Sequence, residues 1–167
     1  IKKIFYKSQK ILIMQKEKII RLKSYRKKGG NLFAIDFQKT FPFKIKRFFY
    51  IFGKKNLIRG DHAHKKCKQI FIPISGKIEL RIKDHKRKKK IILDKKNMAI
   101  MIPNLTWCSL KFQNNNSIVM VVCDRKYEYK DYIEKYSDLS KATYADNDAR
   151  YFRDYAKNAL GIKNENI

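Results

Sequence analysis

The chain has 167 residues, of which 44% are hydrophobic and 13% aromatic, which is enough for one folded core and excludes wholesale disorder. Its 41 Lys and Arg residues against 15 Asp and Glu give a formal net charge of +26, which at first suggests nucleic acid or an anionic membrane as a partner. The basic residues are mostly Lys and are spread along the whole chain. We therefore expect them to be mainly solvated surface, and we expect the protein to bind neither partner.

The cysteines and the apolar runs bear on the cellular compartment. The chain has an odd number of cysteines, and none of them shows Cys-x-x-Cys spacing: they are Cys67, Cys108 and Cys123. This pattern predicts reduced thiols rather than a disulfide framework or a zinc knuckle. No apolar run approaches the ~18 residues of a membrane-spanning helix. The apolar stretch at residues 11–14 is too short and too interrupted by Lys to be a signal peptide. These features predict a cytoplasmic protein.

The chain opens with a Lys-rich segment, residues 1–18, that we separate from the rest of the chain. To about residue 23 the interleaved apolar residues fit a strand or a basic amphipathic helix equally well. From Asn31 onward, short runs rich in β-branched and aromatic residues recur, with turn residues between them. Their spacing of roughly 8–12 residues predicts an all-β sandwich or barrel. The expected strands are residues 32–37, 45–52, 70–74, 78–82, 91–93, 98–102, 109–112 and 118–122.

The pattern changes after the last of these strands. Residues 127–136 are polar and rich in Tyr, and a helix is expected from about residue 146 to residue 160. Asp146 or Asn147 would cap its start, and Gly161 lies where a helix ends. Apolar residues three or four apart give this helix one packing stripe.

Two of the three histidines lie in the string Arg59-Gly60-Asp61-His62-Ala63-His64. Side chains alternate between the faces of a strand, so His62 and His64 are expected to point the same way. Two imidazoles on one face inside a β-fold are typical of a metal site or of an acid–base pair.

The spacing around these histidines resembles the first cupin motif, with Gln69 in place of the usual Glu and Gly76 at its end. The second cupin motif keeps Pro103 but has Cys108 where a His ligand is expected. Glutamine is a weak ligand in place of a carboxylate, although a soft-metal site with both histidines and Cys108 stays open. We expect a metal-free cupin.

Without a metal, the histidine pair suits proton transfer, because imidazole titrates near pH ~6.5 and can both accept and return a proton. Abstraction of a proton next to a ketone also needs a donor or cation near the developing enediolate oxygen. Tyr50 and Arg59 are candidates for that role. The alternative for Tyr50 is that it shares one face of a core strand with Phe48 and Phe52.

At these residues the chain resembles the nucleotide-linked sugar 3,4-ketoisomerases, a WxcM-like cupin family. The resemblance covers about residues 19–139 and is strongest at residues 42–52, at residues 59–66 with Gln69, and at Asp131-Tyr132-Ile133 followed by Tyr136. It implies a cupin, a jelly-roll-like β-barrel, that converts dTDP-4-keto-6-deoxy-D-glucose to a 3-keto-6-deoxyhexose. The galacto configuration at C4 is favoured over gluco. The family also implies no metal or redox cofactor, a homodimer, and a product that an aminotransferase uses in deoxyaminosugar biosynthesis.

The resemblance also implies roles for individual residues. His62 would take the C3 proton, with His64 and Tyr50 beside it in proton relay and substrate positioning. Gly29 stands where the family has an Arg, so a neighbouring basic residue such as Lys28 or Arg26 would replace it at the diphosphate. The remaining expected substrate-binding or supporting residues are Arg59, Arg47, Gln69 and Trp107.

The expected organisation is a segment at residues 1–18, a cupin domain at residues 19–139 and a helical extension at residues 140–167. Three alternatives remain. A cupin-type 3,5-epimerase would show a His–Asp dyad across the barrel, a basic nucleic-acid-binding barrel would expose aromatics among its lysines, and an inactive cupin would only bind.

Overall fold

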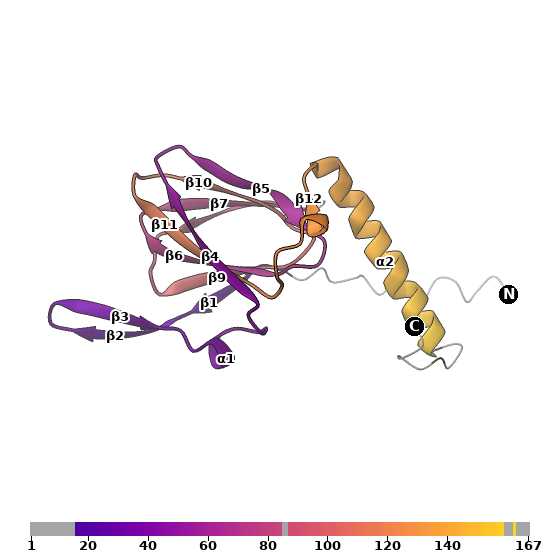
Figure 1. Cartoon of the computed structure of the whole chain (residues 1–167), viewed down its shortest axis with the longest axis horizontal. Coiled ribbons are helices and arrows are strands. Elements are labelled where there is room, and N and C mark those ends of the chain that lie inside the picture. The colour runs from indigo at the N-terminus through magenta and orange to yellow at the C-terminus, as the bar shows by residue number, and fades with distance from the viewer. Residues whose placement is uncertain (1–15, 85–86, 159–161, 163–167) are drawn as a thin grey trace.

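The computed structural model describes residues 16–84, 87–158 and 162. Two five-stranded antiparallel sheets face each other across one core, and a separate two-stranded hairpin projects from them (Figure 1). The first sheet has the order β1 (Lys18–Arg21), β9 (Met98–Ile102), β6 (Gln69–Ser75), β11 (Ser117–Cys123) and β4 (Arg47–Gly53). The second has the order β12 (Tyr132–Ile133), β5 (Ile58–His64), β10 (Trp107–Phe112), β7 (Ile78–Lys83) and β8 (Lys88–Leu93), while β2 (Lys23–Lys27) and β3 (Gly30–Ala34) form the hairpin.

This arrangement confirms the expected all-β cupin class and shows its form. No strand pairing joins the two large sheets within the described ranges, so the jelly roll is a sandwich rather than a barrel closed by hydrogen bonds. Each of the eight predicted strands has a counterpart. The first ends earlier than expected, because β3 stops at Ala34 and a short helix, α1 (Phe37–Thr40), follows with Asp36 as its N-cap.

Alternation along β4 builds two apolar layers. Phe49 and Ile51 point inward and pack against the central cluster of buried residues between the sheets. Phe48, Tyr50 and Phe52 point outward and are 63%, 63% and 65% exposed. The alternative from sequence placed these three residues on one face of a core strand. They do share one face of β4, but that face lies outside the core.

The outer face of the first sheet carries a second apolar layer. Phe41 and Leu22 are buried there against Ile70 and Ile72 of β6, and the side chain of Met120 on β11 joins them. Met120 lies opposite Tyr50 in the β4–β11 register. The exposed aromatic face of β4 is therefore the uncovered continuation of this layer.

Strand β5 contains a bulge immediately before the histidines. Gly60 and Asp61 both have positive φ, at 82° and 61°, and the register with β10 shifts between the pairs His62–Cys108 and Gly60–Ser109. A Cβ on Gly60 would lie 3.1 Å from the Cys108 carbonyl oxygen. The glycine therefore permits the bend that sets the direction of the following side chains.

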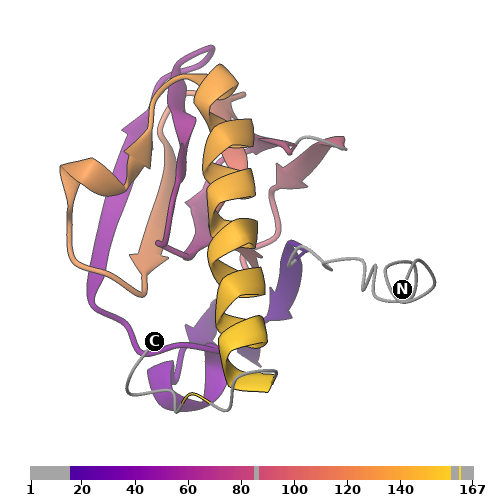
Figure 2. The same cartoon turned by 90° about the vertical axis from the view of Figure 1, so that its right-hand side faces the viewer.

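The C-terminal helix α2 (Tyr136–Asn158) begins earlier than the sequence pattern predicted. Tyr136, Leu139 and Ala142 recur every three residues and pack against the end of the second sheet, which extends the helix into the Tyr-rich segment. Figure 2 shows α2 lying across the end of the sandwich. The predicted stop at Gly161 lies outside the described residues. In the part of the chain that the structure describes, no helix is both long and apolar enough to cross a membrane.

Candidate active site

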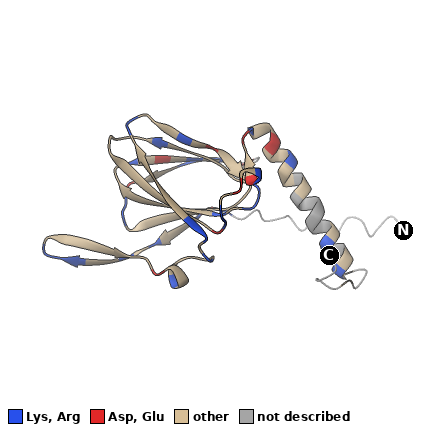
Figure 3. Cartoon of the chain, viewed as in Figure 1, with Lys and Arg blue, Asp and Glu red and all other residues tan. Residues whose placement is uncertain are grey.

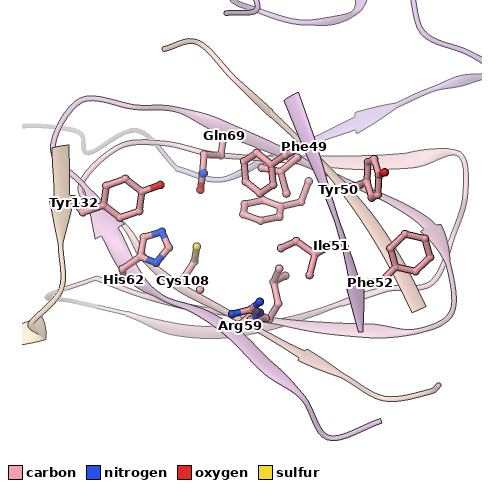
Figure 4. Close-up of a pocket in the computed structure, with 13 residues that line it drawn as sticks. Phe49, Tyr50, Ile51, Phe52, Arg59, His62, Gln69, Cys108 and Tyr132 are labelled. Atoms are coloured by element: carbon pink, nitrogen blue, oxygen red, sulfur yellow. The ribbon is translucent and has the colours of Figure 1, made fainter. Parts of the chain in front are cut away.

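A cavity of about 400 Å³ lies between the two sheets, on the side where β4 faces β5 (Figure 4). Its wall is mainly apolar, with a few polar and titratable groups. These groups are the side chains of His62, Arg59, Gln69, Cys108, Tyr132 and Tyr50.

The two histidines lie on one face of β5, as the sequence predicted, but they differ in access to the cavity. His62 lines the cavity and is half-buried, whereas His64 lies two residues further along the strand and is only 5% exposed. Their ring centroids are 5.0 Å apart. His62 is therefore the imidazole that a ligand in the cavity can reach, and His64 stands behind it.

Asp131 holds His64 in place. Its Oδ2 lies 3.0 Å from His64 Nδ1, and the backbone amides of Lys66 and Cys67 donate to its two oxygens at 2.8 and 3.2 Å. The antiparallel pairing of β12 with β5, which sets Tyr132 opposite His64, brings the two chain segments together. A carboxylate at Nδ1 makes that nitrogen the donor and leaves Nε2 as the free nitrogen. His64 Nε2 is buried with no hydrogen-bond partner among the described residues.

Burial keeps both imidazoles neutral. Desolvation lowers the pKa of His62 below its ordinary value, despite a hydrogen bond with the Gly60 backbone that raises it. Desolvation and the neighbouring His62 also lower the pKa of His64, and the Asp131 carboxylate offsets this only in part. Near neutral pH the pair can therefore accept a proton rather than already carry one.

Tyr132 packs against both histidines. Its ring centroid lies 4.8 Å from that of His62 and 4.4 Å from that of His64, and its hydroxyl points into the cavity (Figure 4). Burial raises the pKa of this phenol, and a hydrogen bond and the positive charge of Arg47 lower it. The predictions from sequence did not include Tyr132 or Asp131 among the site residues.

Arg47 lies behind Tyr132 and is paired with sulfur. Its Nη2 donates to Cys123 Sγ at 3.5 Å, and its guanidinium lies 5.3 Å from the ring centroid of Phe49 and 5.4 Å from that of Tyr127. The neighbouring Cys67 thiol and the hydrogen bond from Arg47 lower the pKa of the Cys123 thiol, while the neighbouring Cys123 raises the pKa of the Cys67 thiol. Cys123 is therefore the more acidic thiol of the pair and the one that faces the guanidinium charge.

The other predicted site residues divide between cavity and surroundings. Arg59 and Gln69 line the cavity. Trp107 lies outside it, where its Nε1 donates to Asp61 Oδ1 at 3.0 Å and its ring contacts Tyr136. Trp107 thus supports the β5 bulge.

Tyr50 and Lys28 are not brought next to the histidines. Tyr50 borders the cavity, but its side chain lies on the far side of β4 from His62 (Figure 4). Lys28 lies in the β2–β3 turn, at the opposite end of the molecule from β12 (Figure 1). Within one chain, the structure separates both residues from the proposed reacting groups.

The four cupin ligand positions do not fit a metal ion. The Gln69 amide nitrogen donates to Cys123 Sγ at 3.8 Å, and His64 Nδ1 is occupied by Asp131. Burial raises the pKa of Cys108 to about 12, so its thiol stays protonated. Metal binding needs deprotonated ligands with free electron pairs, which the two neutral histidines can offer but Gln69 and the protonated Cys108 do not.

Lys and Arg residues are distributed over both sheets, the β2–β3 hairpin and α2 (Figure 3). The net charge is therefore a property of the whole surface rather than of this site.

Comparison with known proteins gives consistent results. The family model described as "FdtA: WxcM-like, C-terminal" matches residues 15–144. The TDP-4-oxo-6-deoxy-alpha-D-glucose-3,4-oxoisomerase of Aneurinibacillus thermoaerophilus is 31% identical over 125 residues, which are 74% of this chain and 90% of that protein.

Solved structures agree with this. The sugar 3,4-ketoisomerase QdtA from Thermoanaerobacterium thermosaccharolyticum, in complex with TDP, has a TM-score of 0.73 and 29% identity over 77% of this chain and 96% of its own. The TDP-fucose-3,4-ketoisomerase WlaRA from Campylobacter jejuni has a TM-score of 0.69 and 32% identity over 75% and 93%. The Mycobacterium tuberculosis rmlC epimerase, at 14% identity and a TM-score of 0.62 over 70% and 66%, shares the fold alone.

Proposed function

This chain belongs to the FdtA family (WxcM-like, C-terminal) and is an isomerase, and from that premise we propose that it converts dTDP-4-keto-6-deoxy-D-glucose to a dTDP-3-keto-6-deoxyhexose. The observation that carries the proposal is His62, a neutral imidazole on the cavity wall, backed by the His64–Asp131 pair. The curated relative is named for the same 3,4-isomerisation.

The proposed chemistry moves a ketone between neighbouring carbons. His62 takes the C3 proton, the C3–H electrons form a C3–C4 double bond, and O4 gains the negative charge. After protonation at O4, loss of the O3 proton and return of a proton to C4 leave the ketone at C3. No atoms or electrons are gained or lost, so this sequence needs proton carriers and no external reactant.

The substrate's diphosphate would be met by basic side chains at the cavity. Arg59 lines the cavity and is exposed, so its guanidinium is accessible to a phosphate in the cavity. QdtA, with a TM-score of 0.73 to this chain, holds TDP in its structure. Lys28 reaches such a ligand only if the hairpin of a second copy brings it there, because its own hairpin points away from β12 (Figure 1).

A homodimer is the proposed assembly, and β4 is its proposed contact. This strand is at the edge of its sheet and presents Phe48, Tyr50 and Phe52 on an uncovered part of an apolar layer. A strand edge paired with its own copy satisfies two-fold symmetry and buries aromatics at the centre. Light scattering should give twice the monomer mass, and Phe52→Asp should give the monomer. Ile92→Asp, on the edge strand β8, is the matched control; dissociation by both variants or by neither would contradict the contact.

We propose that the product has the galacto configuration at C4. Its 3-keto group would then be the substrate of an aminotransferase in deoxyaminosugar biosynthesis. The H4–H5 coupling in the product's NMR spectrum tests the configuration, because it is small when H4 is equatorial and large when H4 is axial. A large coupling would show a gluco product. The cytoplasmic location stays a prediction.

The 3,5-epimerase alternative was expected to show a His–Asp dyad across the barrel, whereas the His64–Asp131 pair joins β5 to the residue before its neighbouring strand β12 in the same sheet. The family match and the identity to ketoisomerases, rather than the dyad, favour the ketoisomerase. The two reactions differ at C5, where only the epimerase exchanges a proton with solvent.

The proposal is tested by His62→Asn. Turnover of dTDP-4-keto-6-deoxyglucose should fall by about 10²–10⁴-fold, as is typical for loss of a general base. Circular dichroism and the unfolding temperature should stay near those of the wild type, because His62 is half-buried and its ring packs on those of His64 and Tyr132, which stay in place. Product formation within a few-fold of the wild type would contradict the assigned base.

A further inference from the structure

The proposed isomerisation moves protons at two oxygens as well as at two carbons. Besides the proton that leaves C3, one proton must reach O4 and one must leave O3. A separate group that lies near both oxygens can carry these two protons while His62 serves the two carbons.

The cavity offers few groups for this task. Among the described lining residues that carry an exchangeable side-chain proton, Cys108 keeps its thiol proton because burial raises its pKa to about 12. The Tyr50 side chain lies beyond β4 (Figure 4). The Arg59 guanidinium has donors but no acceptor and so cannot take the O3 proton, and the Gln69 amide donates to Cys123 Sγ. Tyr132 remains, with its ring against His62 and its hydroxyl directed into the cavity.

We propose that Tyr132 is a further catalytic residue of this isomerase, which donates its phenolic proton to O4 and takes the proton from O3. The inference rests on the proposed function. As His62 takes the C3 proton, the Tyr132 O–H bond breaks and a bond from hydrogen to O4 forms. The phenolate then removes the O3 proton while C4 receives its proton, and Tyr132 ends as it began.

Arg47 is the positioning residue for this step. Burial raises the pKa of the Tyr132 phenol and the Arg47 guanidinium lowers it, so this cation favours the phenolate that forms in the step. Phe49 and Tyr127 hold it by ring contacts, and its Nη2 is bonded to Cys123 Sγ. Because Arg47 is partly buried, its charge stabilises the phenolate more than a fully solvated cation would.

Other titratable groups face the phenol as well. They are His62 and His64 from β5, Tyr127 from the segment before β12, and Cys123 from β11. Both histidines are neutral near pH 7, since burial lowers the pKa of each. Arg47 therefore supplies the nearest positive charge to the Tyr132 hydroxyl among these groups.

The test compares product formation with hydrogen exchange at C3 in deuterated buffer. In Tyr132→Phe, His62 still removes the C3 proton, but the enediolate lacks its carrier. Product formation should fall by about 10²–10⁴-fold, while deuterium entry at C3 falls much less, so the ratio of exchange to product rises. Tyr129→Phe, which removes an exposed hydroxyl bonded to Glu134, should behave as the wild type.

Two results would overturn the proposal. One is product formation by Tyr132→Phe within about twofold of the wild type; the other is an equal fall of exchange and product, which a packing role alone explains. If the wild type itself gives neither exchange nor product, it is the proposed function that fails instead.

Arg47→Gln provides a second measurement. Without the guanidinium charge the phenol holds its proton more tightly, so the alkaline limb of the pH–rate profile should move to higher pH. An unchanged alkaline limb would contradict the role of Arg47 in tuning Tyr132.

Discussion

Asp131 decides which nitrogen of His64 carries the proton. Its oxygens accept from the His64 ring and from two backbone amides, so the carboxylate is fixed before any ligand arrives. A neutral amide at this position can present its NH₂ group to His64 and compete for the wrong tautomer.

We therefore expect Asp131→Asn to lower kcat, by less than the ~10²–10⁴-fold loss expected for His62→Asn. It should also lower the free energy of unfolding by about 1–3 kcal/mol, because buried amides lose a charged acceptor. Steady-state kinetics and urea unfolding measure both. Asp138→Asn, which removes a half-exposed carboxylate that pairs with Lys141 in the first turn of α2, is the control. Equal effects in the two variants would show that Asp131 has no special role.

The lowered pKa values of His62 and His64 predict how activity and stability depend on pH. The unfolded chain protonates these residues near pH ~6.5, whereas the folded chain resists protonation to lower pH. The unfolded state therefore binds more protons as the pH falls, and the folded state loses stability below about pH 6.5.

The acid limb of kcat/KM should accordingly have its midpoint below pH ~6.5. The loss in unfolding free energy between pH 7.5 and pH 5 should be smaller in His62→Gln than in the wild type. A midpoint above pH ~6.5, or a larger loss in the variant, would contradict the lowered pKa of His62.

At the scale of the element, the β5 bulge directs the catalytic histidines. Gly60 has φ 82°, and a Cβ there would crowd the Cys108 carbonyl. Ala at a left-handed position costs about 1–2 kcal/mol. We expect Gly60→Ala to lower the free energy of unfolding by at least this amount and to reduce kcat.

Gly30→Ala is the matched control, because a Cβ at Gly30 meets nothing within 4 Å and its φ is not positive. Denaturant unfolding compares the two variants. A Gly60→Ala protein as stable and as active as Gly30→Ala would show that the bulge is not needed.

Sequence patterns predicted the elements whose apolar periodicity is local. Strands β6, β7, β9 and β11 lie within one residue of the expected ranges, because each shows a clear run or alternation of apolar residues. The polar string that forms β5 has no such run, and its histidines were placed on a strand only through their spacing. The start of α2 was missed because its first turn lies in a Tyr-rich segment that looks irregular.

The site was predictable only where one segment contributes all of it. His62 and His64 are neighbours in sequence, and the family resemblance points to them. Asp131 and Tyr132 belong to one of the strongest pieces of the resemblance, but their contact with the histidines depends on the two-residue pairing of β12 with β5, which no local pattern encodes. Tyr50 was predicted from sequence as a site residue, but the alternation of side chains along β4 directs it outward.

At the scale of the whole molecule, the net charge of +26 comes from basic residues that are spread along the chain and not confined to the active site. Lys and Arg residues lie in both sheets and in the helix (Figure 3), so the surface as a whole attracts an anionic nucleotide sugar. The few side chains that would carry out the proposed isomerisation lie in one cavity between the sheets.

The central claim is that this fold moves a ketone between C3 and C4, and the position of solvent hydrogen tests it most directly. The protein is incubated with dTDP-4-keto-6-deoxyglucose in D₂O, and the sugar is followed by NMR. We predict a new 3-keto sugar, with deuterium confined to C3 of the substrate and C4 of the product. Deuterium at C5, or the absence of both exchange and a new ketosugar, would contradict the account.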